Sequence, residues 1–223
     1  MTSWVGENRW YPSFSVHTDS TYWANRLRFA ETLGGSGDRI QLYHVNGELL
    51  RSFGEMDDPE WAEDNGHLRR WNLGEVIDLS SDRVAFVSHM RPLVEVWNAT
   101  GELLAVRRVE DPRIQRDEPG EFEAGRFRFP IYFEDACWLP DRERIYTLSA
   151  ILPDRDWLIL GFDANNLELK EQYEFTNPGP DRLSFWIARI AAEQEGDSVV
   201  FYATEVFSSN IVILKAKAAR DGP

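Results

Sequence analysis

The sequence contains one cysteine, Cys137, and no apolar run longer than a strand. A single cysteine excludes an internal disulfide and a zinc site made of cysteine thiolates. A stretch such as Ile211–Leu214 is far shorter than the roughly 20 residues that a membrane-spanning helix needs. The histidines lack metal-ligand spacing, and there is no nucleophile elbow, phosphate-binding loop or His-Glu-x-x-His motif. We therefore predict no catalytic residues and no cofactor.

Basic residues are also scarce. The 223 residues include 24 Lys and Arg against 38 Asp and Glu, which gives a formal net charge of −14. Such a surface repels nucleic-acid phosphates and anionic lipids, so we expect neither nucleic-acid binding nor membrane docking. Residues 1–7 lack the basic and apolar regions of a signal peptide. This predicts a cytoplasmic protein, or a periplasmic or extracellular one if further residues precede Met1.

What the sequence does contain is a repeated hairpin pattern. Residues 40–50 align without a gap with residues 94–104, and both segments alternate apolar and polar side chains around a turn that ends in Gly47 or Gly101. Period-two alternation that is broken by a glycine is typical of a β-hairpin. A looser copy spans 158–169, where we expect Asn166 to replace the glycine, and a fourth copy begins at Asn210.

A further pair of strand-like segments precedes each hairpin. The predicted pairs are 14–17 with 26–29, 75–79 with 83–87, 135–139 with 144–148, and 186–190 with 198–202. Four up-and-down strands repeated in series are typical of β-propeller blades, whereas a β-sandwich would not repeat one hairpin at a fixed place. We predict an all-β protein: a single propeller domain over residues 1–223, with four-stranded antiparallel blades starting near 14, 75, 135 and 187.

The hairpin motif resembles the TolB-like six-bladed β-propellers, which include NHL-type repeats. The resemblance is carried by residues 42–54 and 96–104, and the run 118–122 is similar to the Gly-Pro-Gly-Glu-Phe loop of many bacterial members. It covers about residues 14–215. The chain departs from the family because it has four units instead of six, and its last unit lacks a fourth strand. It resembles the C-terminal portion of a six-bladed propeller, and a genuine four-bladed propeller is the competing interpretation.

The resemblance also implies an alternative function. Six-bladed propeller hydrolases, such as gluconolactonases, hold a calcium ion in the central channel with Asp, Asn and Glu side chains, because oxygen ligands suit this hard cation. A calcium-dependent lactonase or esterase is therefore the alternative to a binding protein, and a gene fragment without independent activity is another. The residues that would lie at the mouths of the innermost strands are Asp19, Asn72, Glu75, Glu134 and Asp135.

Connection length indicates where a ligand would bind. The turns after the first and third strand of each unit are short, whereas the connections after the second strand and between units are long. Long loops on a rigid scaffold commonly carry binding residues. We therefore predict a non-enzymatic binding module for a protein or small-molecule ligand. The candidate contacts on the long-loop side are Trp71, Arg91, Arg155 and Phe207.

Two alternatives remain open at the sequence level. The two arginines can pair with nearby carboxylates, and the two aromatic side chains can pack on their own loops. An arc of four blades also need not close into a ring, so the first and last blades would expose apolar faces. We expect these faces either to support self-association or to be covered through completion of the last blade by residues 5–12.

Overall fold

The computed structural model describes residues 13–25, 38–55, 72–80, 82–114, 120–122, 126–128, 131–151, 156–176, 187–205 and 211–217. In these ranges the chain is almost entirely β, since its only helices are the single 3-10 turns η1 (Pro112–Ile114) and η2 (Pro140–Arg142). None of the described helices is long and apolar enough to cross a membrane.

Four antiparallel sheets, named blades 1 to 4, follow one another along the chain. Blade 1 contains β1 (Ser13–Thr18), β2 (Thr21–Asn25), β3 (Ile40–His44) and β4 (Leu49–Phe53). Blade 2 contains β5 (Gly74–Ser80), β6 (Arg83–Ser88), β7 (Leu93–Asn98) and β8 (Leu103–Arg108). Blade 3 contains β11 (Asp135–Leu139), β12 (Arg144–Ile151), β13 (Asp156–Asp163) and β14 (Leu169–Phe175). Blade 4 has three described strands, β15 (Ile187–Glu195), β16 (Ser198–Glu205) and β17 (Ile211–Lys217).

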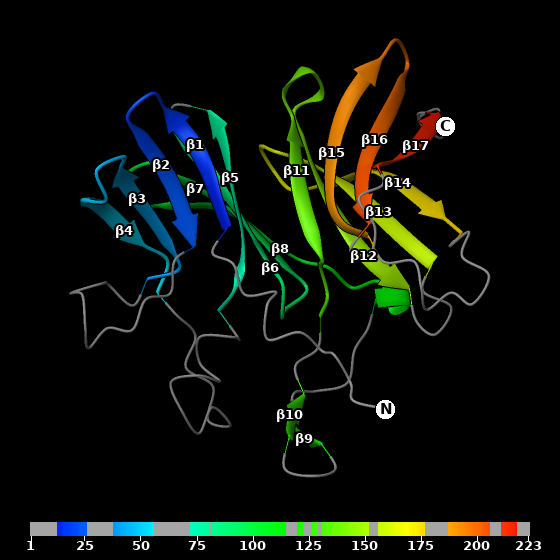
Figure 1. Ribbon diagram of the computed structural model, residues 1–223, viewed down its shortest axis with the longest axis horizontal. Coiled ribbons are helices and arrows are strands. Elements are labelled where there is room, and N and C mark those ends of the chain that lie inside the picture. The colour runs from blue at the N-terminus through cyan, green and yellow to red at the C-terminus, as the bar shows by residue number, and fades with distance from the viewer. Residues whose placement is uncertain are drawn as a thin grey trace.

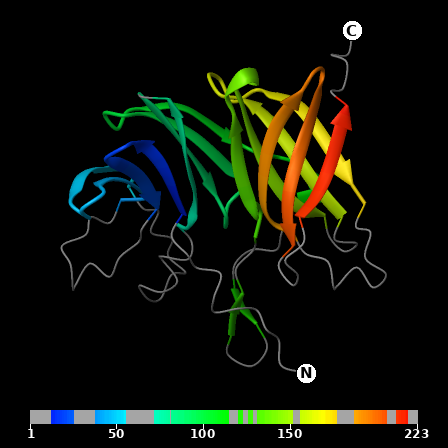
Figure 2. The same ribbon diagram turned by 45° about the horizontal axis from the view of Figure 1, so that its top comes forward.

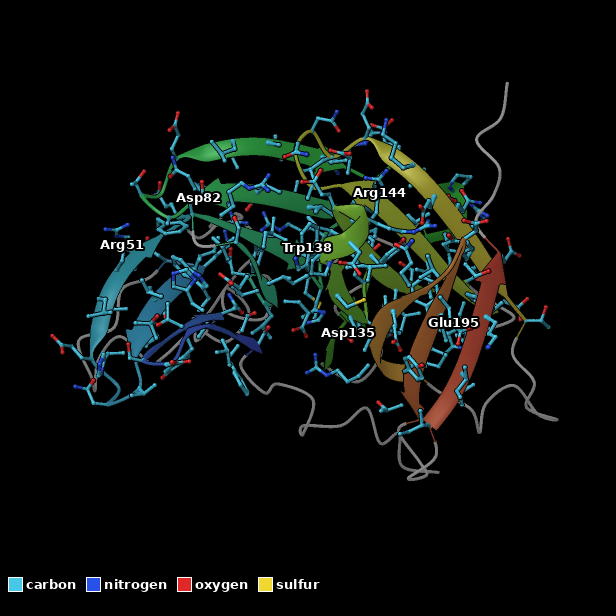
Figure 3. All side chains as sticks on the ribbon, turned by 90° about the horizontal axis from the view of Figure 1, so that it is seen from above. Arg51, Asp82, Asp135, Trp138, Arg144 and Glu195 are labelled. Atoms are coloured by element: carbon cyan, nitrogen blue, oxygen red, sulfur yellow. The ribbon has the colours of Figure 1, made fainter. Side chains whose placement is uncertain are left out.

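The blades form a four-bladed β-propeller, which confirms the predicted fold class. The first strand of each blade is innermost, and β1 contacts β5, β5 contacts β11, and β11 contacts β15. Seen from above, the blades follow an arc whose two ends are blade 1 and blade 4 (Figure 3). The inner strands run upward in Figure 1 and end in short turns at the top. We call this side the turn face and the opposite side, where the inner strands begin, the loop face.

Three hydrophobic clusters lie between neighbouring blades, so the core is divided into layers. Strand alternation sorts side chains between them: on β12, Ile145 packs toward blade 2, whereas Tyr146 and Leu148 pack toward blade 4. Trp97, Trp138 and Trp157 each contribute to one layer, as expected for aromatic residues in the strands of a propeller. The layers between blades 1 and 2, 2 and 3, and 3 and 4 each contain a fully buried phenylalanine, which is Phe86, Phe133 and Phe201 respectively.

The glycine turns have the predicted conformation. Gly47 and Gly101 have φ of 90° and 93°, in the left-handed region that glycine adopts without steric cost. In the first turn the His44 N–H donates to the Glu48 carbonyl at 2.9 Å, and in the second the Asn98 N–H donates to the Glu102 carbonyl at 2.9 Å. The shared geometry explains why the two segments align without a gap.

The third copy of the hairpin differs from its prediction. Its closing hydrogen bond joins the Asp163 N–H to the Glu168 carbonyl at 2.9 Å, so this turn is one residue longer. The left-handed residue is Leu167, with φ of 56°, and not Asn166. Asn166 instead accepts the Glu168 N–H through its side-chain oxygen at 2.9 Å. Leu167 is fully buried between blades 2 and 3, and this burial offsets its backbone strain.

Two other segments differ from the prediction. The second strand of blade 1 is β2 at residues 21–25, directly after a tight turn in which the Thr18 and Thr21 hydroxyls lie 2.6 Å apart. The predicted strand at 26–29 lies outside the described residues. The long connection between blades 2 and 3 also contains a small hairpin, β9 (Gly120–Phe122) with β10 (Arg126–Arg128). This hairpin projects from the loop face, below the blades in Figures 1 and 2.

Candidate functional site at the propeller axis

The inner strands of all four blades begin with polar residues on the loop face. Within its first three positions, β1 carries Ser13, β5 carries Glu75, β11 carries Asp135 and β15 carries Arg189. Neighbouring inner strands run in the same direction (Figure 1) and lie side by side, since the Val76 N–H donates to Ser13 Oγ at 2.9 Å and the Ile190 N–H donates to Asp135 Oδ2 at 2.6 Å. The beginnings of the inner strands therefore meet at one end of the axis.

One arginine joins two of these strand ends. Arg189 Nη1 lies 2.5 Å from Glu75 Oε1 and 2.8 Å from Asp135 Oδ1. His89 adds a fourth titratable group, because its Nε2 lies 3.2 Å from Glu75 Oε1 and its Nδ1 lies 2.8 Å from the Phe133 carbonyl oxygen. We call Glu75, His89, Asp135 and Arg189 the axis cluster.

The members of the axis cluster differ greatly in exposure. The side chains of Glu75 and Asp135 are 9% and 5% exposed, whereas that of Arg189 is 51% exposed. Asp135 is labelled near the inner side of the arc in Figure 3. Arg189 is therefore the charged group that a ligand on the loop face would meet, and the two carboxylates lie beneath it.

The surroundings of the two carboxylates shift their pKa values in opposite directions. Burial alone would raise the pKa of Glu75, but the hydrogen bond and charge of His89, together with the charge of Arg189, lower the pKa to about 2. Burial, followed by the negative charge of Glu75, raises the pKa of Asp135 to about 6 despite Arg189. Burial opposes the charged form of His89, yet its hydrogen bond to Glu75 and the charge of Glu75 raise its pKa. Asp135 is therefore the carboxylate of the pair that takes up a proton first.

The predicted calcium ligands are only partly brought together. Glu75 and Asp135 meet, but Arg189 Nη1 lies within hydrogen-bond distance of both, where a shared cation would have to bind. Asp19 follows the far end of β1 and lies on the turn face. In the part of the chain that the structure describes, no group of three or more His, Cys, Asp or Glu side chains could hold a metal ion. The calcium site stays a prediction.

Of the four predicted ligand contacts, Arg91 alone lies in the described ranges; Trp71, Arg155 and Phe207 fall outside them. Arg91 is buried between blades 1 and 2, with Nε 3.4 Å from Ser88 Oγ. Burial, and then repulsion by Arg39, lower its pKa to about 10 despite the nearby Glu95 carboxylate. The structure therefore places Arg91 inside an inter-blade polar layer, and ligand contact by this residue stays a prediction.

The predicted sharing of one face by the long connections is confirmed for their described parts. The Tyr132 N–H, in the link between blades 2 and 3, donates to the His89 carbonyl in the β6–β7 connection at 2.8 Å. In the same way, the Val109 N–H donates to the Pro92 carbonyl at 2.8 Å. These backbone hydrogen bonds join the β6–β7 connection to the link between blades 2 and 3, on the loop face beside the axis cluster.

Arg189 and His89 were not predicted as site residues. The sequence does contain a signal for Arg189, a charged residue inside the apolar inner strand of blade 4. Its partner Glu75 is 114 residues away, so the contact appears only when the blades are placed around an axis. The sequence gives no sign of the role of His89. Its partner in the fold is the Glu75 carboxylate, and not a second histidine at the spacing of a metal site.

Comparison with protein-family models and with curated proteins finds no match. Among solved structures, the chain is similar to Sqt1 from Saccharomyces cerevisiae, with 13% identity and a TM-score of 0.42 over 91% of this chain and 45% of that one. It is also similar to the Dos1 propeller, with 11% identity and a TM-score of 0.39 over 66% of this chain and 34% of that one. The chain thus corresponds to less than half the length of either structure.

Proposed function

We propose that the protein is a non-enzymatic binding module whose ligand, a protein or a small molecule, docks on the loop face over the axis cluster. One observation carries this proposal. Blades 2, 3 and 4 place Glu75, Asp135 and Arg189 together at the loop-face end of the axis. The Arg189 side chain is half exposed, whereas the two carboxylates that it contacts are buried. Its Nε and Nη2 donate no hydrogen bond within the described residues, so they can bind a ligand carbonyl or other acceptor.

The hydrogen bonds of the cluster favour recognition over nucleophilic catalysis. A serine nucleophile needs a histidine that contacts its hydroxyl. In this cluster the serine is Ser13 and the histidine is His89, and the Glu75 side chain separates them because it is hydrogen-bonded to both. The Ser13 side chain also accepts the Val76 N–H, and the residue is buried. The network instead fixes the position of Arg189, as buried polar networks with satisfied partners do.

The surroundings of the cluster also support binding on this face. Described parts of the long connections of blades 2 and 3 lie beside the axis cluster, and the β9–β10 hairpin projects from the same side (Figure 2). The turn face, in contrast, carries short turns whose polar side chains bond to their own backbone, as Asn98 Oδ1 does with the Thr100 and Glu102 N–H groups. Loops that project from a rigid scaffold are the usual place for ligand contacts.

We also propose a family relationship and a cellular location. The hairpin motif supports kinship with the TolB-like and NHL-type propellers, and the sequence supports a cytoplasmic location. The alternative function, a calcium-dependent lactonase or esterase, has no specific observation in its favour among the described residues.

Site-specific photo-crosslinking tests the proposed function. A photoreactive residue replaces either Pro92, on the loop face before β7, or Thr100, on the turn face after β7, and the variants are irradiated in an extract of the source organism. We expect a crosslinked partner from position 92 that disappears when Arg189→Ala is added, and none from position 100. Crosslinking from position 100 alone, or crosslinking that Arg189→Ala leaves unchanged, would contradict the proposal.

A further inference from the structure

The first and last blades expose apolar side chains on the faces that contact no other described blade. On blade 1, Phe14 and Val16 are 69% and 68% exposed, and with Tyr22 and Val45 they line a shallow hollow of about 450 Å³. On blade 4, Ile211 and Ile213 are 67% and 57% exposed. Exposed apolar residues gathered in this way mark an interaction surface more often than single scattered ones do.

Strand alternation shows which face of each end blade is open. In blade 1, Trp23 and Ile40 pack toward blade 2, and the Ser13 and Ser15 hydroxyls accept N–H groups of β5. Phe14 and Val16, at the intervening positions of β1, therefore point away from blade 2. In blade 4, Val212 and Leu214 pack toward blade 3, so Ile211 and Ile213 point away from it.

The interior blades show what normally covers these two faces. Blade 3 buries both of its sides, with Leu158 and Leu160 against blade 2 and Trp157 and Ile159 against blade 4. Every interior layer thus joins the trailing face of one blade to the leading face of the next. Blades 1 and 4 stand at the two ends of the arc (Figure 3). On the leading face of blade 1, Phe14 and Val16 are exposed although Ala24, Gln41 and Tyr43 on the same face are buried, and on the trailing face of blade 4 Ile211 and Ile213 are exposed. We call these two partly exposed faces the open faces.

We propose that a second copy of this chain covers both faces, with blade 4 of each copy stacked on blade 1 of the other. The stacking interaction is the one that already joins the blades within the chain. A second copy is the partner that offers both missing surfaces at once, and a two-fold axis makes both contacts equivalent and closes the ring. The protruding Ile211 and Ile213 would enter the hollow lined by Phe14, Val16 and Tyr22 of the partner.

Sedimentation velocity and light scattering of three variants test this assembly. Val16→Glu places a charge on the open face of blade 1, and Ile213→Glu does so on that of blade 4. Val106→Glu, on the exposed outer strand β8, is the matched control because this side chain is 55% exposed and lies on neither open face. We expect dimers for the unmodified chain and for Val106→Glu, and half that mass for the two open-face variants. Circular dichroism verifies that each variant keeps its β-sheet content.

Mixing the two open-face variants identifies the arrangement. In a mixture of Val16→Glu with Ile213→Glu, one unmodified pair of faces remains, so a heterodimer should form although neither variant dimerises alone. A monomeric unmodified chain, as expected if its own residues 5–12 completed blade 4, would overturn the proposal. Loss of dimers in only one of the two variants would indicate a contact between like faces, and growing polymers would indicate an open chain; both outcomes also overturn it.

Discussion

At the scale of single residues, two turn glycines share a backbone conformation and differ in their surroundings. A Cβ on Gly47 would meet no atom within 4 Å, whereas a Cβ on Gly101 would lie 3.0 Å from Cβ of Phe53. We expect Gly47→Ala to cost about 1 kcal/mol because of its positive φ, and Gly101→Ala to cost about 2 kcal/mol because Phe53 must also move. Urea denaturation midpoints measure both losses. Equal losses would show that Phe53 makes no difference.

The axis cluster gives a pH prediction at the same scale. The pKa of Asp135 is raised from 3.8 to about 6, so its contribution to stability is complete below the unfolded value and is lost as the pH rises through about 6. Glu75 acts in a separate window, because its lowered pKa gives stability that is present above 4.5 and lost toward about 2. Between pH 4.5 and 7, Asp135 is therefore the carboxylate of this pair that titrates.

Asp135→Asn removes this titration and keeps the shape of the side chain. We expect the stability of the unmodified protein, relative to this variant, to fall by about 2 kcal/mol between pH 4.5 and 7, at roughly 1.4 kcal/mol per pKa unit. Urea denaturation at both pH values gives the two differences, and His89 is present in both proteins. A stability difference that is the same at pH 4.5 and at pH 7 would refute the raised pKa.

At the scale of elements, Glu171 on β14 ties together the strands of blade 3. It accepts hydrogen bonds from Tyr146 at 2.5 Å, from Tyr173 at 2.9 Å and from Arg142 Nη1 at 2.7 Å. Glu171→Leu would leave two hydroxyls and a guanidinium without this acceptor, so we expect a loss of about 2 kcal/mol or more. Glu168→Leu is the control, since its ion pair with Lys170 is at the surface and should change stability little. Similar denaturation midpoints for the two variants would contradict this role of Glu171.

The inner strands give a prediction about calcium. Arg189 Nη1 contacts both carboxylates that a calcium ion would need. We therefore expect millimolar Ca²⁺, compared with Mg²⁺ at equal ionic strength and with EDTA, to leave the melting temperature of the unmodified protein unchanged. A rise in melting temperature that is specific to Ca²⁺ would favour the hydrolase alternative.

Most elements could be predicted from the sequence because their signals are local. Alternation and the two turn glycines located the blades, whereas Asp19-Ser20 contains neither glycine nor proline, and so the turn before β2 was missed. The strands of the β9–β10 hairpin, three residues each, are too short to show a period. Leu167 carries no sequence signal of a left-handed residue, because burial and not local preference holds it there. Glu75 and Asp135 were found from their places at strand starts, but their link through Arg189 depends on the arrangement of blades.

At the scale of the whole molecule, the propeller separates two kinds of surface. The open faces of blades 1 and 4 carry exposed apolar side chains that suit stacking of a second copy, although Glu193 and Lys215 also lie on that of blade 4, whereas the axis cluster lies on the loop face. On blade 4, Arg189 shares a sheet face with Ile211, but it lies at the loop-face end of the inner strand whereas Ile211 lies on the outer strand β17. We therefore expect self-association to leave the axis cluster accessible from the loop face. Variants that abolish dimers should therefore keep the crosslink from position 92, and loss of that crosslink in Val16→Glu would show that the two surfaces are coupled.

The central claim is that ligand binding occurs on the loop face over the axis cluster. Hydrogen–deuterium exchange, measured with and without the partner recovered by crosslinking from position 92, tests it most directly. We predict slower exchange in segments 88–93, 131–135 and 187–190, which surround Arg189, and unchanged exchange in the turns at 98–102 and 163–168. Slower exchange confined to those turns, or equal exchange throughout the described chain, would contradict the claim.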